Sequence, residues 1–366
     1  MEIQDLNLRK NPFENITPHL GDTSADLHWA AMEQIKEEIE NIYVKKGRFR
    51  QLILNWGDWG GGKTFAAQYF RKFPPSIEGM ELTQLYIKTP RDGSKAGSLL
   101  FTKIIDFLSP SNIIGRIESA INIFGTKELY EFLNDRIHNE PIAKGIIWLG
   151  ENNYYSKELK ERYIYGEITS SELKNIKGLS RRLQSDEDFL VFLIGILLCF
   201  IGDGERTNGR VVMWLAETEN LLDLNAAQYK KFSQVLRDLV DNLTENFILF
   251  LNFTLSEPQL ESIQIILGEA LWSRIDKKIR FALRDEEKFK YVADLINHYQ
   301  IRKGNYAPFT KESIDAILDT VKEGNTTPRE INKRFNSIIE YSLDNGFKEI
   351  TVEVVNDWIE FETQIS

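Results

Sequence analysis

The chain has 366 residues, of which 42% are hydrophobic and 27% charged, and its formal net charge is −10. These proportions are typical of a folded globular protein with one large or two ordinary domains. The acidic balance argues against a basic surface for nonspecific nucleic-acid binding, and a single cysteine, Cys199, excludes an intrachain disulfide.

The apolar segments of the chain indicate whether the protein is secreted or inserted in a membrane. The N-terminal residues lack the apolar core of a signal peptide. The most apolar stretch, residues 189–201, is shorter than the roughly 20 residues of a membrane span. We therefore expect a cytoplasmic protein with no membrane partner, in which Cys199 is a small buried side chain.

The first hundred residues alternate between helical and strand patterns. Residues 24–44 carry apolar side chains at helical spacing. Residues 50–56 form a short apolar run, typical of a strand buried on both faces. Residues 64–73 follow as a helix, 82–89 as a second strand and 96–108 as another helix.

The middle of the chain repeats this alternation after a long interruption. A mostly polar insert from about 110 to 188 predicts several helices, and residues 186–201 a buried helix. Two further strands, 210–216 and 246–254, flank a helix at 226–243. Strands that alternate with helices in this way predict an α/β fold with a parallel sheet flanked by helices.

The C-terminal part is helical throughout. After a last strand within residues 277–283, four amphipathic helices follow at 285–300, 310–323, 327–345 and 351–361. Pro328 takes a first helical position, where its missing N–H costs nothing. We therefore expect an α/β domain over residues 1–284, with its helical insert at about 110–188, and a four-helix lid over 285–366.

A phosphate-binding motif lies between the first strand and its helix. Residues 57–64, "GDWGGGKT", fit G-x-x-x-x-G-K-[ST], with the strand before and the helix after that this motif requires. Glycines let backbone N–H groups turn toward phosphates, and the helix N-terminus adds a positive end. The predicted nucleotide contacts are Gly57, Asp58, Trp59, Gly60, Gly61, Gly62, Lys63, Thr64 and Phe65.

Two residues of this motif carry specific chemistry. Lys63 is expected to reach the β- and γ-phosphates, and the Thr64 hydroxyl to hold Mg²⁺. The motif predicts that the loop binds ATP or GTP together with Mg²⁺, and the sheet and motif together predict a P-loop NTPase. The alternative is a purely structural glycine turn.

The acidic residue that should complete the metal site stands in an unusual place. The strand 210–216 ends in Ala216, where an Asp that holds Mg²⁺ is expected, and Glu217 follows. Glu217 could polarise the attacking water or be recruited to the metal, with Glu219 as a fallback. Both could instead be the polar start of a loop. A weakened metal shell predicts a slow ATPase.

Asn252 stands near the end of the neighbouring strand, 246–254. An amide beside the phosphate-loop strand can orient the attacking water. The alternative is an Asn that caps a turn.

Taken together, these residues resemble those of an AAA+ ATPase of the initiator or transposition-regulator type. The resemblance implies that residues 57–64 are Walker A, that 211–217 is a degenerate Walker B and that Asn252 is sensor 1. The stretch "LWSRIDKKIRF" is similar to the box that carries an arginine finger, which implies that role for Arg274. Arg274 could also simply pair with a nearby acid.

The C-terminal helices and the insert extend this resemblance. The stretch from "GNTTPREINKRF" onward resembles the lid of initiator-type ATPases and implies that Arg329 is sensor 2; the alternative is an exposed lid arginine. The insert is arranged like that of BREX-type phage-defence ATPases. Its tyrosines alternate with basic residues over 154–165, a pattern found in base-stacking surfaces and, more often, in an amphipathic helix with a solvated face.

The resemblance implies a nucleotide-controlled, oligomeric assembly factor for a partner protein or nucleic acid, in phage defence, transposition or replication control. The oligomer would contain copies of this chain or another protein subunit, and nucleic acid would be engaged indirectly or through the insert. The alternative is a nucleotide-holding structural subunit with little or no hydrolysis. A small-molecule kinase is disfavoured by the four-helix lid and the finger-like arginine.

Overall fold

The computed structural model describes residues 1–14, 29, 32–152, 154–255, 260–321 and 327–365. By their internal contacts these residues form two compact units. The first unit contains residues 1–43, 56–74 and 280–366, and the second contains 44–55 and 75–279. Each unit is made of separate stretches of the chain. Strands β1 (Arg50–Gly57) and β5 (Lys277–Arg280) each have residues in both units.

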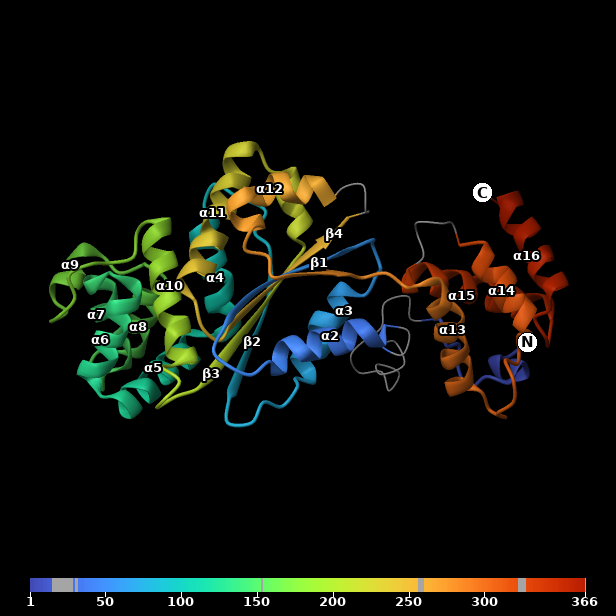
Figure 1. The fold of residues 1–366 in the computed structure, drawn as a ribbon, viewed down its shortest axis with the longest axis horizontal. Coiled ribbons are helices and arrows are strands. Elements are labelled where there is room, and N and C mark those ends of the chain that lie inside the picture. The colour runs from blue at the N-terminus through green and yellow to red at the C-terminus, as the bar shows by residue number, and fades with distance from the viewer. Residues whose placement is uncertain (15–28, 30–31, 153, 256–259, 322–326, 366) are drawn as a thin grey trace. The chain divides into compact units, whose positions relative to one another are not determined.

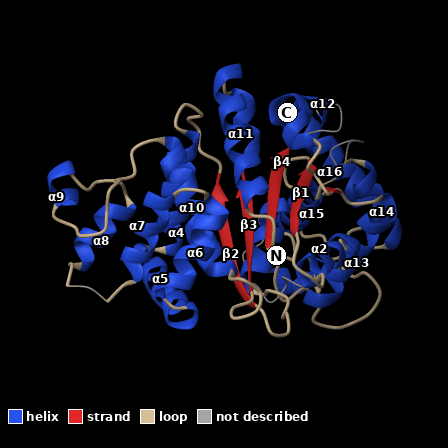
Figure 2. Cartoon of the chain, turned by 60° about the vertical axis from the view of Figure 1, so that its left-hand side comes forward, coloured by secondary structure: helices blue, strands red, loops and turns tan. Residues whose placement is uncertain are grey.

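A five-stranded sheet in the order β2-β3-β4-β1-β5 organises the chain. The remaining strands are β2 (Glu81–Lys88), β3 (Gly209–Ala216) and β4 (Phe247–Thr254). The pairs β2/β3 and β3/β4 are parallel, as Figure 2 shows, with Lys88 opposite Ala216. All the predicted strands are present, and the predicted α/β fold with a parallel sheet flanked by helices is confirmed.

Burial along the strands follows their place in the sheet. β3 is buried over its whole length and β4 over all but its last residue, as befits central strands that are covered on both faces. The rings of Trp214 and Phe250 stack across this pair with centroids 3.9 Å apart. β2 lies at the sheet's edge and is half exposed, which explains its more polar sequence.

The second unit contains the predicted insert as a helical cluster (Figure 1). Its helices are α5 (Pro110–Phe124), α6 (Thr126–Ile137), α7 (Glu140–Gly150), α8 (Lys157–Ile164) and α9 (Ser170–Lys174). The helix α10 (Asp186–Ile201) packs against both β3 and the insert, so almost every residue after Asp188 is buried. Cys199 is among them, as predicted. The other helices of the unit are α4 (Ala96–Leu108), α11 (Ala226–Asn242) and α12 (Leu260–Trp272).

The first unit contains the predicted lid helices. They are α13 (Asp285–Tyr299), α14 (Lys311–Asp319), α15 (Pro328–Asn345) and α16 (Val352–Ile365). Pro328 begins α15, and the Thr327 hydroxyl caps it by accepting the N–H of Glu330 at 3.3 Å. The unit also holds the short helix Ile3–Leu6, α2 (Glu33–Val44) and α3 (Lys63–Lys72). Of the predicted first helix, residues 24–28 and 30–31 lie outside the described residues.

Aromatic side chains of α2 and α3 pack with Trp29 in the core of the first unit. Trp29 packs its ring 5.6 Å from that of Phe65 and 5.7 Å from that of Phe70. Tyr43 of α2 stacks on Phe70 at 5.4 Å. Within the described part of the chain, every helix is too short or too polar to cross a bilayer.

Candidate nucleotide site

The predicted phosphate loop has the expected strand–turn–helix geometry. β1 ends at Gly57 and α3 begins at Lys63. Gly57, Gly60 and Gly62 have φ angles of 146°, 84° and 100°. Only glycine adopts such angles readily, so the glycines of the motif are required by the path of the backbone.

The start of the loop is packed tightly against the segment after β5. A β-carbon placed on Gly57 would lie 2.5 Å from the carbonyl oxygen of Phe281, and one on Gly61 would lie 2.7 Å from the same atom. The Phe281 N–H donates to the carbonyl oxygen of Trp56 at 2.8 Å. Phe281 therefore packs directly against the phosphate loop. A side chain at Gly57 or Gly61 would clash with the Phe281 carbonyl group and displace it.

Lys63 is buried inside the loop. Its side chain is 6% exposed, and its ammonium donates to the carbonyl oxygens of Gly57 at 2.7 Å and Asp58 at 2.9 Å. A buried ammonium requires such partners because its desolvation is costly. The positive charge, the glycine backbone and the N-terminus of α3 together fit a phosphate group.

The neighbouring side chains of the motif differ in exposure. Trp59 is 62% exposed, and Thr64, in the first turn of α3, is exposed as well. The Phe65 ring is buried against Trp29, so its side chain belongs to the core, and its predicted nucleotide contact would come from the backbone.

Arg329 lies against the same loop. A β-carbon placed on Gly60 would lie 2.5 Å from Cβ and 3.0 Å from Cδ of Arg329. Arg329 is the second residue of α15, where the positive end of the helix dipole disfavours a cation. A bound anion would offset that repulsion. The first unit thus brings together the loop, Lys63 and Arg329.

The acidic strand end lies in the second unit. Ala216 is buried, and its carbonyl oxygen accepts from the Thr89 N–H at 2.8 Å and hydroxyl at 2.9 Å. Glu217 follows with a φ of 57°, which is uncommon for a residue with a side chain. Its carboxylate pairs with the Lys88 ammonium at 2.6 Å and thereby raises the pKa of Lys88. Lys88 ends β2, so Glu217 is engaged on the side of β3 away from β4.

Glu219 reaches the opposite neighbour of β3. Its carboxylate accepts the N–H of Thr254, the last residue of β4, at 3.3 Å. The Thr218 hydroxyl, one residue earlier, donates to the carbonyl oxygen of Asn252. The segment after β3 is a short 3-10 helix, Thr218–Asp223, rather than an open loop. Within the described residues, no three His, Cys, Asp or Glu side chains gather as a metal site.

Asn252 is buried inside β4, at 3% exposure, and therefore does not cap a turn. Its side-chain oxygen accepts from the amide of Asn55 at 2.9 Å. Asn55 belongs to β1, and β4 lies between β1 and β3 in the sheet. The predicted sensor thus lies on the strand next to the one that leads into the phosphate loop.

Arg274 is held by an acid, as the alternative reading expected. Its guanidinium binds Asp241 of α11 through Nε to Oδ1 at 2.5 Å and Nη2 to Oδ2 at 2.7 Å. It also donates to the carbonyl oxygen of Ala270. The ion pair raises the pKa of Arg274. Its role as a finger toward a second subunit stays a prediction.

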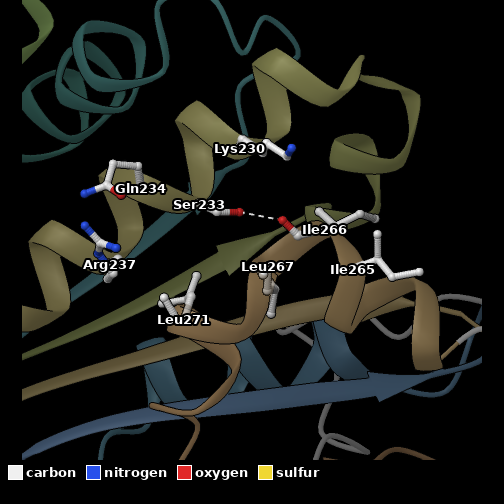
Figure 3. Close-up of a pocket in the computed structure, with 10 residues that line it drawn as sticks. Lys230, Ser233, Gln234, Arg237, Ile265, Ile266, Leu267 and Leu271 are labelled. Carbon is white, nitrogen blue, oxygen red and sulfur yellow. Dashed lines mark hydrogen bonds between the residues drawn. The ribbon is translucent and has the colours of Figure 1, made fainter.

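A small cavity of about 240 Å³ lies between α11 and α12 (Figure 3). α12 kinks at Gly268, whose φ is 68°, and the Ser233 hydroxyl donates to the nearby carbonyl oxygen of Ile266 at 2.7 Å. Lys230 and Arg237 lie on the α11 side of the cavity. Its lining contains none of the predicted nucleotide residues.

Three partners of the predicted residues were not expected from the sequence: Asn55 for Asn252, Lys88 for Glu217 and Asp241 for Arg274. Only Asn55 leaves a signal, because it is an amide inside the otherwise apolar run "LILNW". The other two are ordinary charged residues whose pairing depends on the fold.

The sequence matches no protein-family model and no curated protein sequence. Among solved structures, Cdc6p from Pyrobaculum aerophilum is similar with a TM-score of 0.46 at 13% identity, over 96% of this chain and 70% of that one. The ORC2 protein of Aeropyrum pernix gives 0.42 at 12%, over 96% and 71%. The Drosophila ORC bound to DNA gives 0.47 at 10%, over 95% and 64%. Likenesses this distant do not assign the chain to a family.

Proposed function

We propose that the chain is an AAA+ ATPase of the initiator or transposition-regulator type, which binds ATP and uses it to control assembly with other subunits. Its partner would be a protein or a nucleic acid, in phage defence, transposition or replication control. Turnover would be slow. Homo-oligomers and hetero-oligomers with a second subunit are both compatible with this role.

The observation that carries the proposal is the position of Arg329 against Gly60. The side chain of Arg329, at its Cβ and Cδ, and the ammonium of Lys63 both lie against one glycine turn within a single compact unit. Two cationic side chains that lie against one glycine turn at a helix N-terminus suit a polyphosphate, because an anion held by that turn could pair with both.

The remaining residues have separate proposed roles. Mg²⁺, held by Thr64 and a carboxylate from Glu217 or Glu219, would neutralise charge that develops on the transferred phosphoryl group. Asn252 would orient the attacking water. Arg274 would act on nucleotide held by a neighbouring subunit, after release from Asp241.

The second candidate is a structural subunit that holds nucleotide without hydrolysing it. Ala216 supplies no carboxylate at the strand end, and the Glu217 carboxylate is already paired with Lys88. Metal-dependent phosphate release separates the two candidates, because only the first predicts it.

Nucleotide binding is tested with Lys63→Ala. Loss of a charge-assisted contact to phosphate should weaken ATP binding by about tenfold or more. Titration of a fluorescent ATP analogue measures the affinity, and Lys127→Ala, at an exposed position of α6, is the matched control. Unchanged affinity in a folded Lys63→Ala protein would contradict the proposal.

A further inference from the structure

The fold divides the tyrosines at the end of the insert into two sets. Tyr163 of α8 is fully buried, and the Tyr165 hydroxyl donates to the carboxylate of Asp106 at 2.9 Å. These two side chains are part of the packing of the insert. Tyr154 and Tyr155, which we call the tyrosine pair, lie between α7 and α8. The Tyr154 side chain is 88% exposed, the highest value among the large apolar and aromatic residues that the structure describes.

The exposed Tyr154 ring is the outer end of an aromatic column. It lies 4.6 Å from the ring of Tyr155, with 33° between the two planes, and the Tyr155 ring lies 5.6 Å from that of Trp148. Trp148 is only 4% exposed and anchors the column in α7. An aromatic ring left in water contributes none of the stability that its burial would give. The column therefore presents an aromatic surface that packing within the insert does not use.

Two lysines lie in the turn beside the tyrosine pair. The Tyr155 hydroxyl accepts the N–H of Lys177 at 3.2 Å and donates to the carbonyl oxygen of Asn175 at 3.4 Å. These hydrogen bonds hold residues 174–178, which we call the lysine turn, against the pair. Lys174 and Lys177 are exposed, and neither forms an ion pair with another described residue.

The local charge is opposite to that of the chain. Residues 154–184 contain seven Lys or Arg and four Glu, whereas the whole chain has a net charge of −10. Exposed aromatic rings beside basic side chains are the two components of surfaces that bind single-stranded nucleic acid. An acidic peptide could pair with the lysines, but it would offer no planar group to the Tyr154 ring. A duplex keeps its bases stacked inside the helix, so that only a single strand offers both a base face and a phosphate.

We propose that the tyrosine pair and the lysine turn form a stacking site for single-stranded nucleic acid. A base lies on the Tyr154 ring, and the two lysines bind the phosphates on either side of it. Such a site tolerates any sequence, because every base has a flat face and every nucleotide a phosphate. This inference rests on the proposed function only in taking nucleic acid as the partner, and it needs no nucleotide in the phosphate loop.

The stacking contact is tested at Tyr154, with the anisotropy of a labelled thymidine strand of about 20 nucleotides as the measure of binding. Tyr154→Ala should weaken binding about tenfold, as for the loss of one stacked base, and Tyr154→Phe, which keeps the ring, should stay within about twofold of wild type. Tyr154→Leu keeps an apolar side chain without a ring and should behave like the alanine variant. Ile123→Ala removes an apolar side chain that is 46% exposed on α5 and should bind like wild type.

The lysines are tested by the salt dependence of the same binding. Each lost phosphate contact should reduce the slope of log affinity against log salt by about 0.7 for a single strand. Lys177→Ala should show this reduction, whereas Lys127→Ala, with a side chain 80% exposed on α6, should keep the wild-type slope. An unlabelled single strand should compete better than a duplex of the same sequence or a polyglutamate peptide. Equal competition by polyglutamate would indicate general anion binding and overturn the inference.

Binding is measured with and without a nonhydrolysable ATP analogue, and circular dichroism melts establish that each variant is folded. A wild-type chain that binds no single strand under either condition would overturn the inference, as would a Tyr154→Ala or Tyr154→Leu variant that binds like wild type. A chain that binds ATP while Tyr154→Ala has no effect would overturn this inference alone. A chain that binds no ATP but binds single strands through the Tyr154 ring would overturn the proposed nucleotide function and support this site.

Discussion

Glu217 and Glu219 are two residues apart and yet engage different neighbours of β3. Glu217 adopts a left-handed backbone conformation and pairs with Lys88 on β2, whereas Glu219 accepts an N–H at the end of β4. β4 carries Asn252 and lies next to β1, the strand of the phosphate loop. Glu219 is therefore engaged with the strand that carries Asn252, whereas Glu217 is engaged with the edge strand β2.

We expect Glu219→Gln to lower ATP turnover more than Glu217→Gln. A general base or metal ligand contributes about 10²-fold or more, whereas loss of the half-exposed Glu217–Lys88 pair should cost little because solvent screens it. Phosphate release at saturating Mg²⁺ measures both variants, and Glu205→Gln in an exposed turn is the control. A larger loss in Glu217→Gln would return the catalytic role to that residue.

At the scale of elements, the pattern of apolar residues was sufficient to locate the strands and α10 in the sequence. β1, β3 and β4 read as continuous apolar runs because they are buried on both faces, and α10 lacks a polar face because it packs between β3 and the insert. The kink of α12 at Gly268 could not be predicted from the apolar pattern, because a single glycine in an apolar helix does not show whether or in which direction the helix bends. The polar partners Asp241 and Lys88 were likewise unpredictable, because pairing across elements depends on tertiary structure.

The burial of α10 makes Cys199 a reporter of unfolding. Burial raises the pKa of its thiol to about 12, so on the order of one thiol in 10⁵ would be ionised at pH 7. We expect a thiol-reactive chromogenic disulfide to label the native protein very slowly and the urea-unfolded protein at once. Labelling of native protein as fast as a free thiol peptide would show that α10 is not the buried helix described here.

At the scale of the molecule, the phosphate loop could be located from the sequence, whereas the contacts of Arg329 and Arg274 could not. The motif at residues 57–64 carries its own geometry, because its glycines are demanded by backbone angles that no other residue adopts readily. Arg329 could be matched only by resemblance, and the lid places it against Gly60. Arg274 could be matched equally well, but its guanidinium is bound to Asp241 in the same chain.

The Arg274–Asp241 ion pair must break before Arg274 can bind the nucleotide of a neighbouring subunit. A half-exposed pair of this kind is worth about 1 kcal/mol or less, so a neighbouring subunit that offers a triphosphate can displace Asp241 at modest cost. We expect a nonhydrolysable ATP analogue to induce assembly of the wild-type chain and not of Arg274→Ala. Arg274→Lys should also fail, because an ammonium cannot reproduce the planar fork of a guanidinium.

Asp241→Asn provides the opposite change within the same pair. It removes the competing charge and should let assembly occur at lower concentrations of the analogue, by up to about fivefold for an interaction of 1 kcal/mol. Light scattering across a titration of the analogue measures all four proteins, with Glu205→Gln in an exposed turn as the control for lost negative charge. If wild type and Arg274→Ala assemble alike, Arg274 is a structural partner of Asp241 and another residue meets the neighbouring nucleotide. If wild type stays monomeric with saturating analogue that it demonstrably binds, this chain does not assemble with itself, and the assembly role requires a second kind of subunit.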